Sequence, residues 1–337
     1  MGDSDNTDSG PLAEAQKLAE EAVALLQAGK PGASANKLGR AARLAHESGD
    51  FAEYARYLYS QALTLAQLPQ ERARAESLWR RSAAAANVAG RLDLEVKALS
   101  RIAPLYANEG DREGAIAQLT ALVELMTKHD QTARSAELVG VMRDRARLYM
   151  SRGIDEQNRI FVDRARRDLR AAADLARAID MNRLALETRL ELRALEAVMP
   201  GQEQPPETFA SLRAEAEALG DAAVLGSLEI EQSMAEMRAG AFERALAHAE
   251  AARRAALDTP DPVRYLIACM LIAEARENTG DRAGVIAILL TCKATLERLM
   301  GKAAGQQVKL VLDSLEHRWG RDGVAAALAE YRANMGS

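Results

Sequence analysis

Histidine, cysteine and carboxylate side chains are the groups in this sequence that could carry out nucleophilic, acid–base or metal chemistry. None of the histidines has the His-Glu-x-x-His spacing of a metalloprotease. Cys269 and Cys292 form no CxxC pair and fall on apolar helical faces, so we interpret them as small buried residues. No Gly-rich phosphate loop follows a predicted strand, and no Ser–His–Asp arrangement is recognisable. We therefore expect no enzyme activity, metal or cofactor, although carboxylates that the fold brings together stay open. The histidines are His46, His129, His248 and His317.

The composition indicates an almost entirely helical chain. Hydrophobic residues make up 48% of the 337 positions but aromatic residues only 4%, so the apolar content is mostly Ala and Leu. Together with Glu, Arg and Gln these are strong helix formers, whereas Pro is rare. Only eight of the 44 basic residues are Lys, and an excess of Ala and Arg is typical of a GC-rich genome. We expect a bacterial protein.

Charge and hydropathy exclude two classes of partner and indicate a location. The net charge of −5 lacks the basic surplus of a nucleic-acid-binding protein. No apolar run approaches the ~20 residues of a membrane span. The acidic N-terminus has neither the basic nor the apolar region of a signal peptide. We expect a soluble cytoplasmic protein that binds neither nucleic acid nor membrane, with a disordered tail over residues 1–11.

Turn signals divide the remaining chain into roughly sixteen segments of helical length. Gly at such a stop supplies a left-handed residue after a helix, and a following Asp or Ser can cap the next helix. The pattern predicts antiparallel helical hairpins in series. Their internal turns fall near residues 29, 69, 110, 153, 201, 240, 280 and 320, about 40 residues apart.

Small and large apolar residues repeat in phase with these turns. A small residue precedes the turn, a second small residue follows it, and larger residues surround both. The stronger copies are Ala103, Tyr106, Gly110, Asp111, Ala115, Leu119 and Leu122; Ala273, Gly280, Asp281, Val285, Leu289 and Cys292; Ser233, Gly240, Phe242, Ala245, Ala249 and Ala252; and Ala22, Gly29, Ser34, Leu38 and Ala41. The weaker copies are Leu63 with Ala75, Trp79 and Ser82; Ala146, Tyr149 and Gly153 with Ala165, Leu169 and Ala172; and Gly320 with Ala325.

This pattern resembles the tetratricopeptide repeat superfamily over about residues 12–335. The spacing near 40 residues, rather than 34, is similar to that of the longer maltose-regulator-like variant. The resemblance implies a single all-α domain, a right-handed α-solenoid of about eight antiparallel hairpins in which small residues of paired helices meet. The Lys/Asn/Arg clamp of chaperone-binding members is not recognisable. The register is unclear in 181–219.

Two features distinguish the middle of the chain. Long turns are predicted near 153–164 and 199–206, and insertions of this kind are either tolerated at the surface or lie on a functional edge. Residues 131–200 also carry 14 Arg and no Lys against 11 acidic residues, a positive surplus within an acidic chain. The simpler interpretation is a solvated face with ion pairs.

The resemblance also implies where a partner would bind. In such solenoids the first helix of each hairpin lines a concave groove, which would be basic at its centre and then rich in Met. Exposed Met suits peptide partners, but these Met residues could instead pack against the next hairpin. The implied partner-binding residues are Tyr57, Lys97, Asn108, Arg143, Arg147, Met150, Met234, Met237, Met270 and Asn278.

We interpret the chain as a non-catalytic protein–protein interaction scaffold or adaptor whose concave groove binds a partner segment with acidic and apolar character. The alternative is a sensory or regulatory module that binds a small molecule or inducer in a deep apolar cavity. A self-assembling structural protein is a third possibility, so a homo-oligomer stays open. The identity of the partner is not encoded in any motif.

Overall fold

The structure is a computed structural model that describes residues 10–198 and 208–335, and within these ranges it contains helices and no β-strand. The predicted all-α class is therefore confirmed. Most of the predicted N-terminal tail and the predicted long turn at 199–206 lie outside the described residues. The chain divides within α10 into two compact units, Met1–Asp168 (unit 1) and Leu169–Ser337 (unit 2). That residues 12–335 form one domain stays a prediction.

Unit 1 contains α1 (Pro11–Gln27), α2 (Pro31–Glu47), α3 (Phe51–Leu65), the 3₁₀ turn η1 (Pro69–Glu71), α4 (Arg72–Val88), α5 (Leu92–Leu99), α6 (Ile102–Asn108), α7 (Arg112–Thr127), α8 (Asp130–Ala133), α9 (Ala136–Asp155) and the start of α10 (Arg159–Ala178). Unit 2 contains the rest of α10, α11 (Asn182–Val198), α12 (Phe209–Leu219), α13 (Ala222–Arg238), α14 (Phe242–Asp258), α15 (Pro262–Asn278), α16 (Arg282–Met300) and α17 (Gly305–Met335).

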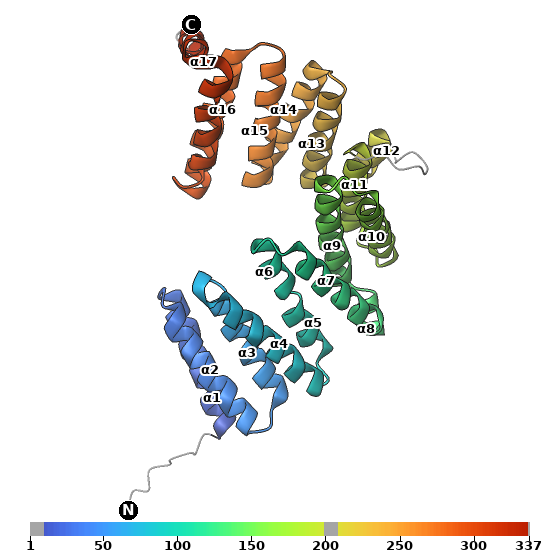
Figure 1. Ribbon diagram of the computed structural model, residues 1–337, viewed down its shortest axis with the longest axis vertical. Coiled ribbons are helices and arrows are strands. Elements are labelled where there is room, and N and C mark those ends of the chain that lie inside the picture. Colours follow the sequence, from blue (N-terminus) through green and yellow to red (C-terminus); the bar gives the residue numbers. More distant parts are fainter. Residues whose placement is uncertain (1–9, 199–207, 336–337) are drawn as a thin grey trace, which may run out of the picture. The chain divides into compact units, whose positions relative to one another are not determined.

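Each unit is built from antiparallel helix pairs that stack on one another. In unit 1, α1 packs on α2, α2 on α3 and α3 on α4; in unit 2, α13 to α16 follow the same rule (Figure 1). Helices therefore contact mainly their neighbours in sequence, as in repeat proteins, where stability accumulates from one unit to the next. The predicted solenoid of hairpins is confirmed at this level.

The paired helices cross where both carry small residues. The Ser34 hydroxyl on α2 donates to the Ala22 carbonyl on α1 at 2.7 Å, and that of Ser233 on α13 donates to the Ala245 carbonyl on α14 at 2.8 Å. A side-chain hydroxyl can reach the backbone of the next helix only when the two helices lie very close. Both pairs are small-residue pairs predicted from the sequence, and Ala22 and Ala245 are 1% and 0% exposed.

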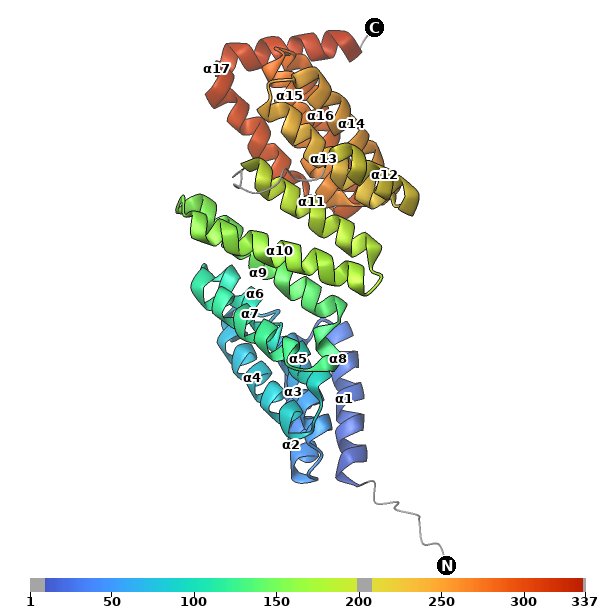
Figure 2. The same cartoon turned by 90° about the vertical axis from the view of Figure 1, so that its right-hand side faces the viewer.

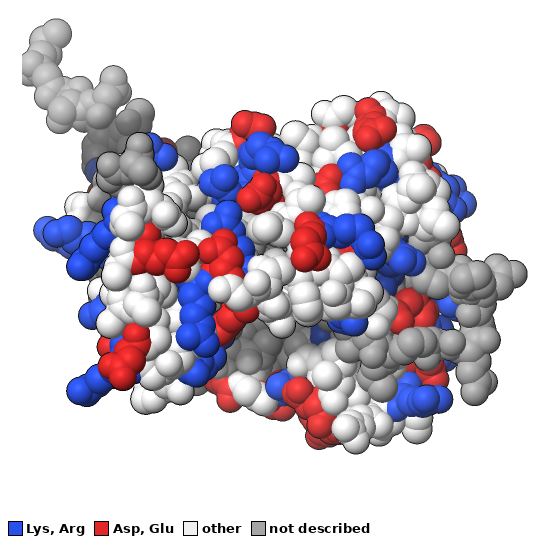
Figure 3. Space-filling model, turned by 90° about the horizontal axis from the view of Figure 1, so that it is seen from above, with Lys and Arg blue, Asp and Glu red and all other residues white. Residues whose placement is uncertain are grey.

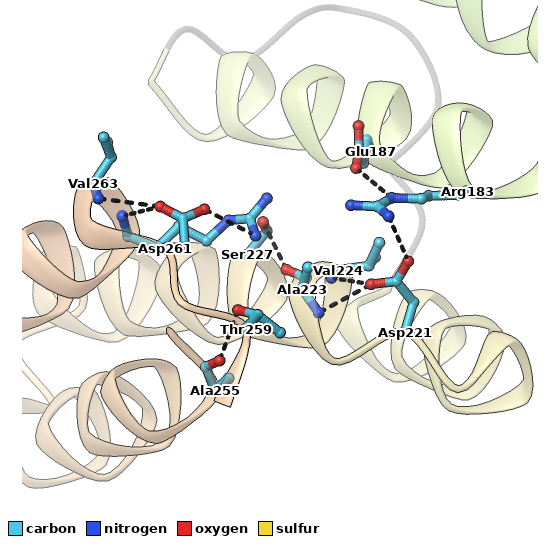
Figure 4. Close-up of polar contacts among 11 residues, drawn as sticks. Arg183, Glu187, Asp221, Ala223, Val224, Ser227, Ala255, Thr259, Asp261 and Val263 are labelled. Carbon is cyan, nitrogen blue, oxygen red and sulfur yellow. Dashed lines mark hydrogen bonds and ion pairs between the residues drawn. The ribbon is translucent and has the colours of Figure 1, made fainter. Parts of the chain in front are cut away.

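Glycine and aspartate form the predicted turns. Gly29, Gly110, Gly240 and Gly280 have φ between 71° and 83°, the left-handed region in which a side chain is strained. Asp221 accepts hydrogen bonds from two backbone N–H groups in the first turn of α13, and Asp261 does the same at the start of α15 (Figure 4). The same figure shows that Asp221 also pairs with Arg183, at 3.2 Å, which ties α11 to α13.

Three local predictions are wrong. The expected long turn at 153–164 spans only residues 156–158, because the extra residues extend α9 and α10. Gly153 lies inside α9, where an added Cβ would be 2.7 Å from Val162, so it permits close packing instead of turning the chain. The small residue before the turn at 69 is Ala62, which is fully buried, whereas Leu63 is 42% exposed.

Two helices are broken at residues that explain the break. The chain between residues 92 and 108 is divided into α5 and α6 just before Pro104, because a proline ring inside a helix clashes with the carbonyl four residues earlier. The helix α17 bends at Gly320, where φ is 73° (Figure 2). Beyond the bend, Val324, Leu328 and Tyr331 pack against the core of unit 2. This segment therefore covers part of the apolar core of unit 2.

The close crossing predicts a strong effect of added volume at Ala245. Ala245→Leu should lower the free energy of unfolding by about 1–3 kcal/mol, because a larger side chain at the crossing pushes α13 and α14 apart. Ala247→Leu is the matched control, since Ala247 is exposed on the same helix, and it should change stability by less than about 0.5 kcal/mol. Urea denaturation followed by circular dichroism measures both, and equal stabilities for the two variants would contradict a tight crossing.

Candidate functional site

A groove of about 680 Å³ runs between α2 and α4 in unit 1, and α3 forms its floor. Three consecutive helices therefore contribute to it. The lining residues are Asn36, Gly39, Ala42, Arg43, His46 and Glu47 on α2; Tyr54, Leu58 and Gln61 on α3; and Arg74, Ser77, Leu78 and Arg81 on α4.

The floor of the groove is fixed by contacts to the helix backbones. Leu58 and Gln61 are buried, at 2% and 6% exposure. The Gln61 side-chain amide donates to the Ala35 carbonyl at 3.1 Å, so its position is set by α2. This contact requires Gly39, because an added Cβ there would be 2.7 Å from Gln61 Nε2. The floor is thus partly apolar, with one amide held in place.

The walls of the groove carry a positive charge that nearby acids hardly offset. Arg81 donates to the neutral Tyr54 hydroxyl at 2.8 Å, and Arg74 contacts Glu71 at 3.4 Å with its side chain 56% exposed. Arg43 is exposed and makes no hydrogen bond or ion pair with any described residue. The Arg74–Glu71 pair is weak, because it is partly exposed and its atoms are 3.4 Å apart. Glu47 is the acidic residue among the lining side chains.

In unit 1, three of the predicted partner-binding residues lie on α3, α5 and α6. Tyr57 is 9% exposed and lines a second pocket, of about 430 Å³, against residues of α1; burial raises the pKa of its hydroxyl, and Glu53 adds to the shift. Lys97 is exposed, with its ammonium 5.3 Å from the centre of the Tyr59 ring. Asn108 is exposed at the end of α6. Tyr57 is thus mainly a core residue.

On α9, the predicted arginines flank a third one that sequence reasoning missed. Arg147 is exposed and pairs with Asp144 at 2.9 Å, while Arg143 and Met150 are half-buried. Between them Arg145 forms two hydrogen bonds of 2.7 Å with Asp168, and both side chains are nearly buried. Burial alone would lower the pKa of Arg145, but the bonds to Asp168 outweigh it and raise the pKa. Arg145 therefore joins α9 to α10.

In unit 2, the predicted Met residues contribute partly to the core. Met234 on α13 and Met270 on α15 are half-buried and pack against the main apolar cluster of this unit. Met237 is half-buried, and Asn278 is exposed and donates to the Glu274 carbonyl at 2.9 Å. For Met234 and Met270 the packing interpretation considered from the sequence therefore holds. Whether the ten predicted residues bind a partner stays a prediction.

A half-buried carboxyl group with a shifted pKa lies on α13, the helix that also carries Met234 and Met237. Burial raises the pKa of Glu231 on α13 to about 7, against the opposing effect of Arg238 and Arg193 and with a further contribution from Glu191. Among the described residues no hydrogen bond to Glu231 is formed. The carboxyl group therefore changes its charge near neutral pH, an environment that sequence spacing did not indicate.

Glu229 and the two cysteines have structural roles. In the described ranges, no three His, Cys, Asp or Glu side chains come together as a metal site requires. His248 shares the Glu229 carboxylate with Arg213, each at 2.7 Å. Burial would raise the pKa of Glu229, but these two partners outweigh it and lower the pKa. Cys269 and Cys292 are free buried thiols, as the sequence predicted.

The described surface carries charges of both signs. On the face shown in Figure 3, Lys and Arg alternate with Asp and Glu, and the described residues form no continuous patch of one sign there. None of the described helices combines the length and the apolar character needed to cross a bilayer.

Comparisons with known proteins place the chain in no named family. A scan against models of protein families finds no match, and a search of curated proteins finds no significant one. The chain is similar to the crystal structure of BtubC (BKLC) from P. vanneervenii, with 14% identity and a TM-score of 0.33 over 90% of this chain and 91% of that one. It is also similar to a circular tandem repeat protein with novel repeat topology and enhanced subunit contact surfaces, with 16% identity and a TM-score of 0.26 over 97% and 86%. Membership of the tetratricopeptide superfamily stays a resemblance.

The basic groove was missed because its residues do not belong to the repeat pattern. Arg74, Ser77 and Arg81 lie three and seven positions apart, and Gly39 and Arg43 follow Asn36 at the same intervals. These spacings place each set on one helix face. The sequence does show an outward polar stripe on α2 and another on α4, the second helices of the first two hairpins. Only the packing shows that these two stripes face each other.

The Glu231 environment predicts a pH-dependent stability. The carboxyl group titrates near 4.5 in the unfolded chain and near 7 in the folded one, so its favourable contribution is complete below pH 4.5 and is lost as the pH rises to about 7. The loss should be about 3 kcal/mol. Glu231→Gln should remove this part of the difference between pH 5 and pH 8 in urea denaturation.

Glu274→Gln is the control for that measurement. Glu274 is exposed on α15, so its replacement should leave the pH dependence of the wild type unchanged. If Glu231→Gln and the wild type lose the same stability between pH 5 and pH 8, the carboxyl group of Glu231 titrates normally and the interpretation is wrong.

Proposed function

We propose that this protein is a non-catalytic interaction scaffold or adaptor that binds a segment of another protein in the groove between α2 and α4. One observation carries the proposal: side chains from three consecutive helices line a groove with exposed arginines on its walls and a fixed floor. Stacked helical hairpins suit this task, because the side chains on their outer faces can differ while the crossing residues keep the backbone in place.

The groove favours a protein segment over a small inducer. A site for a small molecule buries most of its ligand in a largely apolar cavity. Here Arg43, Arg74, Ser77 and Arg81 on the walls are exposed. Side chains of a peptide can lie between such walls while its backbone stays near the solvent.

Affinity capture tests the proposed function. The full chain is immobilised, incubated with native cell extract, and the bound proteins are identified by mass spectrometry. We expect at least one protein to be retained in near-stoichiometric amount and to be lost, by more than tenfold, on Arg74→Glu/Arg81→Glu.

The first-helix face predicted from the sequence provides the comparison. Arg143→Glu/Arg147→Glu changes the charge on α9 by the same amount and should leave the capture unchanged if the groove is the site. Loss of the partner on this variant alone would assign binding to α9 instead. Failure of the wild-type chain to retain any protein would contradict an adaptor function.

A further inference from the structure

We infer that the groove between α2 and α4 selects an extended acidic segment of a partner protein, with two carboxylates three residues apart on either side of an apolar side chain. This inference rests on the proposed function and adds the chemistry of the partner.

The charge of the groove requires an anionic partner. Three arginines line it, whereas Glu47 is the one carboxylate among the lining residues. The guanidinium of Arg81 is bound to a neutral phenol, and that of Arg43 has no partner among the described residues. Arginine presents a planar fork of N–H donors that matches a carboxylate, and hydrogen bonds between two charged groups are the stronger kind. The groove therefore offers charge-assisted donors that the described residues leave largely unused.

The spacing of the arginines indicates a chain and not a single small anion. Arg74 and Arg81 are seven residues apart on one face of α4, a rise of about 10 Å along the helix. The two guanidinium groups have different partners, Glu71 for Arg74 and the Tyr54 hydroxyl for Arg81, so they do not converge on one point. A peptide in the polyproline II conformation advances about 3.1 Å per residue with three residues per turn, so acidic residues three positions apart lie on one side of it and match the two arginines. Arg43 lies on the opposite wall and can contact a third acidic side chain.

The floor explains the apolar residue between the two acids. Leu58 and Leu78 lie at the bottom of the groove, at 2% and 6% exposure, and can receive one apolar side chain. Gln61 donates through Nε2 to α2, so its Oε1 atom is directed elsewhere and can accept a hydrogen bond from a peptide N–H. The groove thus combines two charged contacts, one apolar contact and one amide contact.

A peptide selection tests this inference independently of any natural partner. A random twelve-residue library displayed on phage is selected on the full-length chain, and the enriched peptides are synthesised with a fluorescent label. We expect the enriched peptides to share two Asp or Glu residues separated by two positions with an apolar residue between them. Their affinity, measured by fluorescence anisotropy, should fall as salt is raised.

Three matched variants locate the contact. Arg74→Glu/Arg81→Glu should weaken the peptides by more than tenfold, and Arg74→Lys/Arg81→Lys should retain part of the affinity, because it keeps the charge and loses the fork. Arg254→Glu/Arg298→Glu has the same net charge as the first variant but changes exposed arginines of unit 2, and it should bind as the wild type does. Circular dichroism confirms that each variant is folded.

Several results would overturn the inference. Enriched peptides without acidic residues, no enrichment at all, or equal weakening by the two Glu variants would show that the groove does not read an acidic segment. Capture of a partner from extract that is unaffected by Arg74→Glu/Arg81→Glu would do the same while leaving an adaptor function intact. Absence of any captured partner together with selected acidic peptides would instead contradict the proposed function.

Discussion

The close crossing of paired helices at small residues is the constraint on which the rest of this structure depends. At these points Ala side chains are fully buried and Ser hydroxyls bond directly to the carbonyl groups of the facing helix. An intramolecular hydrogen bond of this kind contributes about 1 kcal/mol. The close crossing has a larger effect on the register of the helices, because only one rotation and one axial position of each helix bring a small residue to the crossing.

Register at the crossing also sets the direction of the polar side chains. On α4, Ser82 is buried and donates to the Ala55 carbonyl at 2.7 Å, while the preceding residue, Arg81, reaches the Tyr54 hydroxyl beside the groove. On α2, Ser34 contacts α1, and the carbonyl of Ala35 accepts from Gln61 on α3. Consecutive residues therefore fix a helix to its neighbours and position the groove.

Charged residues contribute unequally to this framework. Many of the ion pairs are exposed or half-exposed, and such pairs add little to stability. The Arg145–Asp168 pair differs, because both side chains are nearly buried and share two hydrogen bonds. Removing either partner would leave a buried charge without compensation, which commonly costs about 3–5 kcal/mol. Glu231 shows the opposite case, a half-buried carboxyl group whose pKa is raised because no hydrogen-bonding partner among the described residues offsets its desolvation.

The helical class, the turns and the small residues that meet at the crossings could be predicted from the sequence, because these features depend on local propensity and on spacing along one helix. Ser34 with Ala22 and Ser233 with Ala245 could be named in advance for this reason. The role of Gly153 could not be predicted, because residue type alone does not distinguish a glycine required for close packing from one required for a turn. The facing stripes on α2 and α4 and the surroundings that raise the pKa of Glu231 could not be predicted, because both depend on side chains that packing brings together, which no spacing in one chain encodes.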